Sequence, residues 1–116
     1  MFNYKELDPE LVEYVAVEEA EALKDGERLF IDIDNLPIVV FKIAGQYFAI
    51  ADVCSHDNGP VGEGDLEGYE VICPRHGARF DIRTGGVLLL PAVVDIPAYP
   101  VRLNNGQIEV GVPVEG

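Results

Sequence analysis

The sequence predicts an all-β fold, a β-sandwich or barrel into which a small subdomain with two loops is inserted. Short runs of strand-forming residues follow one another along most of the chain, separated by turn residues. Twelve Gly and eight Pro among 116 residues supply those turns. This length is enough for one hydrophobic core and too small for two, so we expect a single domain over residues 1–116.

The N-terminal segment predicts one strand and a short helix. Residues 1–10 are mostly polar, and we expect them to lie over the edge of the fold. Leu11–Val17 is rich enough in strand formers to be a first strand. Glu18–Lys24 is acidic and suits one helical turn or two, which Asp25-Gly26 would end.

From Arg28 onward the pattern is that of strands joined by hairpins. Arg28–Asp34 alternates apolar and polar residues over most of its length, and Asn35-Leu36-Pro37 is expected to form a turn. Ile38–Ile43 and Tyr47–Ala51 flank Ala44-Gly45-Gln46. Because this connection is short and contains Gly, it predicts a β-hairpin.

The second half predicts shorter strands around the inserted loops. Its expected elements, in order, are a loop at 57–65, strands at Tyr69–Ile72 and Ala78–Asp81, a turn at Thr84–Gly86, an apolar segment at Val87–Val94 interrupted by Pro91, and strands at Ala98–Leu103 and Ile108–Val112 around Asn104-Asn105-Gly106. An Asn-Gly pair between two strands is a strong hairpin signal. We therefore expect about four strands, then the inserted loops on short strands, then two closing strands.

The net charge of the chain is −13, from 21 acidic and 8 basic residues. This balance argues against nucleic acid as a partner, because phosphate contacts need clustered Lys and Arg. An acidic surface favours solubility, and it would also steer the chain toward a basic protein partner.

No targeting or membrane-spanning segment is apparent in the sequence. The first residues lack the basic and apolar regions of a secretory signal, and no apolar run approaches the eighteen or so residues that span a bilayer. We therefore expect a cytoplasmic protein without membrane attachment, whose two cysteines stay reduced.

Both cysteines and both histidines of the chain fall in two short pairs. Cys54 and His56 form the first pair, sixteen residues follow, and Cys73 and His76 form the second. Buried structural cysteines beside surface histidines would explain each residue singly, but not the pairing. Two thiols and two imidazoles on two loops predict one metal site clamped between the loops.

Two kinds of metal centre fit this ligand set. A structural zinc ion binds two Cys and two His, but its usual pattern pairs Cys with Cys and His with His. Here each loop supplies one of each. This suits a dinuclear iron centre, in which both thiolates bind one iron and both imidazoles bind the other. A zinc-stapled interaction domain remains the alternative.

The pattern CSH, sixteen residues, CPRHG resembles the signature of the Rieske [2Fe-2S] proteins. Weaker features of that family also match: Gly59-Pro60, FDIRTG at Phe80–Gly85, Pro91-Ala92, and the closing pattern from Tyr99 to Val110. The resemblance covers roughly Arg28 to Val112. It implies a β-sandwich base with an inserted subdomain, and one cluster per chain held by loops within about residues 53–94.

The resemblance also assigns a role to each predicted ligand. Cys54 and Cys73 would hold the inner iron, and His56 and His76 the outer iron, with the imidazole edges near solvent. Replacing two thiolates by imidazoles removes two negative charges from the site. This raises the reduction potential above that of an all-cysteine cluster.

Two departures from the family pattern predict a cluster of low potential. Rieske proteins of bc-type complexes carry a further cysteine in each loop, which form a disulfide; this chain has no further cysteines. Those proteins also have Ser and Tyr where this chain has Ala78 and Phe80. Without the two hydroxyl donors, we expect a potential near the low end of the Rieske range, roughly −150 mV.

The resemblance is therefore to soluble Rieske ferredoxins, which take an electron from a flavin-dependent reductase and pass it to a terminal oxygenase. It implies an electron-transfer component, not an enzyme, with transient docking at the face formed by His56 and His76. A small Rieske subunit of a nitrite reductase and a ferredoxin of another pathway are the alternatives. An oxygenase subunit is not expected, because the chain has no room for a catalytic domain and no His left over for a 2-His-1-carboxylate iron.

Several neighbours of the predicted ligands also bear on the site. Pro74 and Gly77 are expected to shape the second loop and to offer backbone donors, and Gly59, Gly62 and Gly64 suit tight turns or close backbone approach. Leu88-Leu89-Leu90 is either core or, if exposed, a docking patch. Arg75 and Arg79 tune the site, meet an acidic partner, or are solvated surface residues; the sequence leaves these three roles open.

Overall fold

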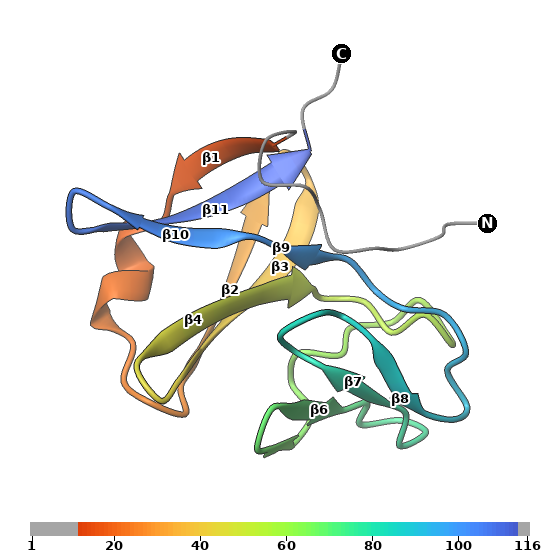
Figure 1. Cartoon of the computed structure of the whole chain (residues 1–116). Helices are drawn as coiled ribbons and strands as arrows, with labels where there is room; N and C mark the ends of the chain where they lie inside the picture. Colours follow the sequence, from red (N-terminus) through yellow and green to blue (C-terminus); the bar gives the residue numbers. More distant parts are fainter. Residues whose placement is uncertain (1–11, 114–116) are drawn as a thin grey trace.

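The computed structural model describes residues 12–113, which form three antiparallel sheets and one short 3-10 helix (Figure 1). The elements are β1 (Val12–Ala16), η2 (Glu18–Ala22), β2 (Arg28–Ile33), β3 (Leu36–Ile43), β4 (Gln46–Ala51), β5 (Leu66–Glu67), β6 (Glu70–Ile72), β7 (Arg79–Asp81), β8 (Val87–Leu89), β9 (Ala98–Tyr99), β10 (Val101–Asn104) and β11 (Gln107–Pro113).

The three sheets divide the chain into a base and an insertion. One base sheet has the order β1-β11-β10 and the other β2-β3-β4-β9, while β5-β6-β7-β8 form a sheet of their own. All of this third sheet comes from the segment between β4 and β9. Figure 1 shows it at the opposite end of the molecule from β1, β10 and β11. The prediction of an all-β fold with an inserted subdomain is confirmed.

Strand β3 is buried on both faces, because it lies between two cores. Ile38 and Val40 pack into the core shared with β11, whereas Val39 and Phe41 pack into the core shared with the inserted sheet. The alternation of a strand sends successive side chains to opposite faces. The same sheet therefore supports the base on one side and the inserted subdomain on the other.

Three two-residue turns connect the hairpins of the base, and all have positive φ at both central residues: Asp34-Asn35, Ala44-Gly45 and Asn105-Gly106. This is the type I′ geometry, whose twist matches that of the paired strands. The hairpins predicted at the second and third turns are confirmed. The predicted turn at Asn35-Leu36-Pro37 is wrong by about two residues, because Asp34 and Asn35 tolerate positive φ and Pro37 lies inside β3.

The predicted strand at Ala98–Leu103 is in fact two strands in different sheets. Ala98 and Tyr99 pair with β4, and from Val101 onward the chain pairs with β11. Pro100 lies at the change, where its missing N–H interrupts one ladder and its carbonyl accepts a bond from Gly111 N at 2.8 Å. Strand β5 was not predicted, because two residues carry no periodic pattern.

The other elements match their predictions within a residue or two, except that only Val87–Leu89 of the predicted apolar segment Val87–Val94 forms a strand, β8. The acidic segment forms η2 over Glu18–Ala22, and β1 occupies Val12–Ala16 within the predicted first strand. Leu11 and the segment 1–10, expected over the edge of the fold, lie outside the described residues.

Candidate metal centre

The two loops that carry the predicted ligands share one backbone design. In the first, Cys54 N–H donates to Gly59 O at 2.7 Å, and Asn58 N–H donates to Cys54 O at 2.7 Å. In the second, Cys73 N–H donates to Ala78 O at 2.7 Å and Gly77 N–H to Cys73 O at 3.0 Å. Asn58 and Gly77 both have positive φ, 62° and 78°. Each cysteine is thus enclosed by its own loop in the same way.

The shared design buries the thiols and exposes the imidazoles. Cys54 and Cys73 are 0% and 1% exposed and belong to the core beneath the inserted sheet. His56 and His76 are exposed, and their ring centroids lie 5.1 Å apart. All four predicted ligands therefore come together, with a thiol pair inside and an imidazole pair outside.

Neighbouring side chains fix the first loop and the segment beside it. Asp52 Oδ1 accepts the N–H groups of Val61 and Gly62 at 3.0 and 2.7 Å, which holds the chain where it leaves the loop. Between the ligands of the first pair, the Ser55 hydroxyl donates to Val94 O. This bond ties the first loop to the apolar segment that follows β8.

One residue after His56, Asp57 joins the two loops. Its carboxylate accepts from Arg75 Nε at 2.6 Å and Nη2 at 2.8 Å, and lies 3.5 Å from His76 Nδ1. The Arg75 guanidinium holds the pKa of Asp57 well below its usual range, and Asp57 in turn raises the pKa of Arg75. Sequence reasoning missed Asp57. The available signal was that each ligand histidine has a charged neighbour in sequence, Asp57 after His56 and Arg75 before His76, and that these two charges are opposite.

The donor set fits the two-iron interpretation. One ligand atom each from Cys54, Asp57 and Cys73 lies within 4.8 Å of the others. Burial raises the pKa of the Cys54 thiol, and the neighbouring Cys73 sulfur raises it further. Two thiolates packed together in an apolar core need a cation to balance their charge. The Asp57 oxygens already accept hydrogen bonds from Arg75 and Gly59. We therefore interpret this carboxylate as a neighbour of the thiols and not as a metal ligand.

The two positions that set the expected potential are both in the core. Ala78 and Phe80 are each 0% exposed, in the same core as the cysteines. The second loop therefore meets methyl and phenyl groups where a hydroxyl would supply a hydrogen bond. Gly77, expected to offer a backbone donor, uses its N–H inside the loop for Cys73 O.

The glycines of the first loop serve close packing against protein groups. A Cβ at Gly59 would lie 2.8 Å from the Arg75 guanidinium carbon, and one at Gly62 would lie 2.8 Å from the Phe30 ring. At Gly64 it would lie 1.6 Å from the Ile72 carbonyl oxygen. The last contact is with backbone just before Cys73, so no side-chain movement can relieve it.

Replacing Gly64 by Ala should lower the Tm of the cluster-loaded protein by about 10 °C, because the strand that leads into Cys73 has to shift. Thermal unfolding followed by circular dichroism measures this. Gly86→Ala is the matched control, since its Cβ meets only the Thr84 hydroxyl at 3.1 Å. Equal Tm values for the two variants would contradict the packing role of Gly64.

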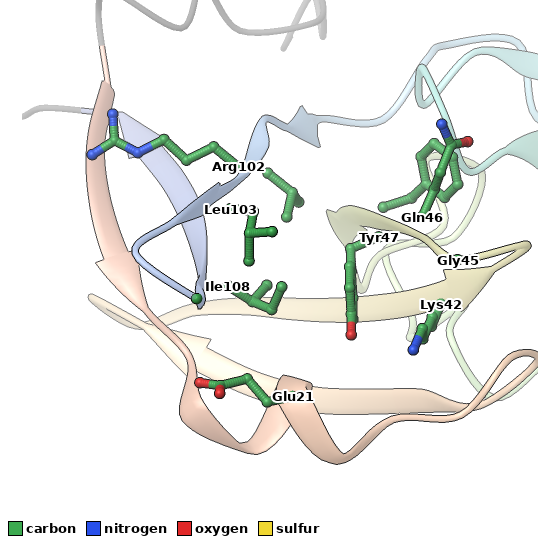
Figure 2. A pocket seen from close by; sticks show the side chains of 11 residues that line it. Glu21, Lys42, Gly45, Gln46, Tyr47, Arg102, Leu103 and Ile108 are labelled. Carbon is green, nitrogen blue, oxygen red and sulfur yellow. The ribbon is translucent and has the colours of Figure 1, made fainter.

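A cavity of about 640 Å³ lies in the base, between the β3–β4 and β10–β11 hairpins (Figure 2). Figure 2 shows the Tyr47 ring between Leu103 and Ile108 on one side and Lys42 on the other. None of the four predicted ligands lines this cavity. The chemistry that the loops bring together is therefore separate from it.

The Rieske [2Fe-2S] domain model matches residues 13–100 of the chain. The chain belongs to the Rieske [2Fe-2S] family. The Rieske-type fold and a Rieske-type cluster as cofactor follow from this membership, in agreement with the sequence interpretation. The match includes the whole inserted subdomain and most of the base.

Among Rieske proteins, this chain is similar to ferredoxin components of dioxygenases. It is 40% identical over 90 residues to the 3-phenylpropionate/cinnamic acid dioxygenase ferredoxin subunit of Escherichia coli (strain K12), covering 77% of this chain and 84% of that protein. The ferredoxin of carbazole 1,9a-dioxygenase from Nocardioides aromaticivorans IC177 superposes with a TM-score of 0.77 at 32% identity, over 84% of this chain and 95% of the other.

A third similar protein is found in the solved structure of a complex of reduced oxygenase and oxidized ferredoxin in carbazole 1,9a-dioxygenase. It matches with a TM-score of 0.77 at 26% identity, over 84% of this chain and 92% of that chain. These relatives are electron-transfer components, and the Rieske chain described here is likewise an electron carrier, not a catalytic enzyme. Among its described residues, no helix has the length and apolar character to cross a membrane.

Proposed function

We propose that this Rieske protein takes single electrons from a flavin-dependent reductase and passes them to the terminal oxygenase of a ring-hydroxylating system. The observation that carries the proposal is the arrangement of buried thiols beneath exposed imidazoles on two matched loops. The dioxygenase ferredoxins among its relatives support the oxygenase as acceptor. The chemistry of the donor set supports the ligand assignment.

In this proposal Cys54 and Cys73 hold the inner iron and His56 and His76 hold the outer iron. The cluster, when bound, supplies a one-electron couple. The thiols keep their iron out of water, because their loops and the core around them exclude solvent. His76 has half of its side chain exposed, at 52%, and offers a partner a short path for the electron. The proposal needs no substrate pocket in this chain.

The docking surface is proposed to include the apolar residues that follow the second ligand loop. Leu88, Leu89, Leu90 and Val93 are 50%, 50%, 69% and 73% exposed, and the Ser55–Val94 bond ties their segment to the first ligand loop. No charged residue occurs from Thr84 to Val94. Exposed apolar residues beside a redox centre suit the small interfaces of transient electron-transfer complexes.

Replacing Leu90 by Gln should raise the KM for this protein in electron transfer to its oxygenase about tenfold, the cost of leaving one leucine out of an interface. The reduction potential should not change. Leu103→Gln is the matched control, because Leu103 is 70% exposed, against 69% for Leu90, but lies on the β10–β11 hairpin. An unchanged KM for Leu90→Gln, or an equal rise in both variants, would contradict docking through the segment that contains Leu90.

A reconstituted system tests the function itself. The cluster-loaded protein is mixed with a flavin-dependent reductase, NADH and a dioxygenase terminal oxygenase, and product is measured with and without the ferredoxin. We expect product formation to depend on this protein and to stop in a cluster-free preparation. Reduction by the reductase without transfer to any oxygenase would favour another acceptor, such as a nitrite reductase.

The proposal places the protein in the cytoplasm, where a flavin-dependent reductase has access to NADH. Reduced thiols suit this compartment, since both cysteines are free in the described structure. Fractionation of cells that express the protein measures its location directly.

A further inference from the structure

We propose that Asp57 and Arg75 form a clamp that locks the two ligand loops together and positions His76 at the cluster. The inference rests on the proposed ligand set and concerns a different property of it, how firmly the loops hold the cluster. Asp57 follows His56 by one residue, and Arg75 precedes His76 by one. The clamp therefore joins the two loops next to their exposed ligands.

Three hydrogen bonds cross from the second loop to the first. Arg75 donates Nε to Asp57 Oδ2 at 2.6 Å, Nη2 to Asp57 Oδ1 at 2.8 Å, and Nη1 to Pro60 O at 2.7 Å. The first two are the paired bonds in which the planar guanidinium matches a carboxylate. With the third, the same side chain also holds the backbone where the first loop ends.

The surroundings favour a single geometry for the pair. The Gly59 N–H donates to Asp57 Oδ1 at 2.9 Å, which orients the carboxylate before Arg75 reaches it. The guanidinium lies against Gly59, where a Cβ would come within 2.8 Å of its carbon. The Arg75 and Asp57 side chains are 34% and 22% exposed, so solvent screens the attraction between their charges only in part. Most exposed ion pairs lack this preorganisation and contribute little.

The sequence provides no covalent link between the two ligand loops, so side-chain contacts have to hold them together. Each ligand loop is closed by backbone hydrogen bonds to its own cysteine, and these bonds do not join one loop to the other. The chain has two cysteines, both predicted ligands, so no disulfide can join the loops. Asp57 and Arg75 are eighteen residues apart in sequence, and their contact closes the segment between the ligand pairs.

The clamp also sets the charge beside one ligand. Asp57 Oδ2 lies 3.5 Å from His76 Nδ1. Arg75 compensates this negative charge. Removing either partner therefore changes the field at the cluster in opposite directions: loss of Asp57 favours the reduced form, and loss of Arg75 disfavours it.

The test uses Arg75→Gln, Asp57→Asn and the double variant, each loaded with cluster and mixed with an iron chelator. Loss of visible absorbance gives the rate of cluster release, and spectroelectrochemistry gives the potential. We expect release about tenfold faster in each single variant, as for one lost charge-assisted hydrogen bond, and no faster in the double variant. We expect a higher potential for Asp57→Asn, a lower one for Arg75→Gln, and a value near wild type for the double variant.

Arg79→Gln is the matched control. Arg79 also follows the second ligand pair closely, but it pairs with Glu67 and Glu70 at 2.9 and 3.5 Å, away from the first loop. Its release rate should stay within twofold of wild type. If Arg75→Gln does not assemble, Arg75→Lys replaces it, with an expected release rate between those of wild type and Asp57→Asn.

Two results overturn the clamp: a release rate for Arg75→Gln within twofold of wild type, or equal acceleration by Arg79→Gln. Potentials that shift in the same direction in both single variants also overturn the positioning of His76. Failure of the ligand set looks different, since the wild-type protein itself would then lack a mixed-ligand iron spectrum.

Discussion

Replacing Cys73 by Ala is expected to abolish assembly of the cluster, with iron and acid-labile sulfide at least about tenfold below wild type. The Cys73 thiol is 1% exposed and faces a site from which water is excluded. Water cannot replace a thiolate there, and the nearby Asp57 carboxylate already accepts bonds from Arg75 and Gly59. Metal and sulfide analysis of the purified variant, with circular dichroism to confirm folding, measures the result.

Asp57→Asn supplies the control for this experiment. Its carboxylate lies within reach of both thiols, so it is the rival third ligand in the described structure. We expect this variant to contain the same iron and sulfide as wild type when assayed directly after assembly. His76→Ala should lose the cluster. Full retention in His76→Ala, together with loss in Asp57→Asn, would show that the carboxylate is the ligand.

The same analysis separates iron from zinc. A structural zinc site would give a colourless protein with one zinc ion and no sulfide. The proposed centre gives iron and sulfide in equal amounts and a reddish-brown colour. Cluster lost during purification is recognised by reconstitution with iron and sulfide, which restores the colour in a cluster-binding protein and not in a zinc protein.

The second large effect is expected at the positions that lack hydroxyl groups. The double variant Ala78→Ser, Phe80→Tyr should have a reduction potential higher than wild type by roughly 60–120 mV, since each new hydrogen bond stabilises the more negative, reduced cluster. The starting value is expected near roughly −150 mV. Both positions are 0% exposed, so the new hydroxyls cannot be satisfied by bulk water.

Ala49→Ser is the matched control for this shift. Ala49 is also buried, at 2% exposure, but it belongs to the core of the base and not to that of the cysteines. Its potential should equal that of wild type. An unchanged potential in the double variant would show that hydroxyl donors do not tune this cluster, and a wild-type potential above about +100 mV would refute the low-potential assignment.

Much of the fold could be predicted because its signals are local. Alternation marked β2, strand-forming runs on either side of a short connection marked β3 and β4, and Gly or Asn marked the turns at Ala44-Gly45 and Asn105-Gly106. The turn at Asp34-Asn35 was misplaced, because Pro37 is itself a common turn residue and here sits inside a strand. The chain changes from one sheet to the other at Pro100 because different strands lie beside it there. Local sequence patterns do not predict which strands these are.

The features of the site also divide into local ones, which the sequence predicted, and contacts made by folding, which it did not. The spacing of Cys54, His56, Cys73 and His76 predicted one site between two loops, and the structure brings these four residues together. Sequence reasoning singled out Arg75 but did not identify its partner Asp57, because this contact depends on how the loops fold against each other. The burial of Ala78 and Phe80 and the exposure of Leu88–Leu90 likewise came only from the packed structure.

Pulsed electron paramagnetic resonance of the reduced protein, prepared with ¹⁵N-labelled histidine, tests the ligand set most directly. If His56 and His76 both bind the outer iron, two strongly coupled histidine nitrogens appear, and they are absent when only the backbone is labelled. A spectrum without strong histidine coupling, or with a single coupled nitrogen, would contradict the mixed-ligand centre proposed here.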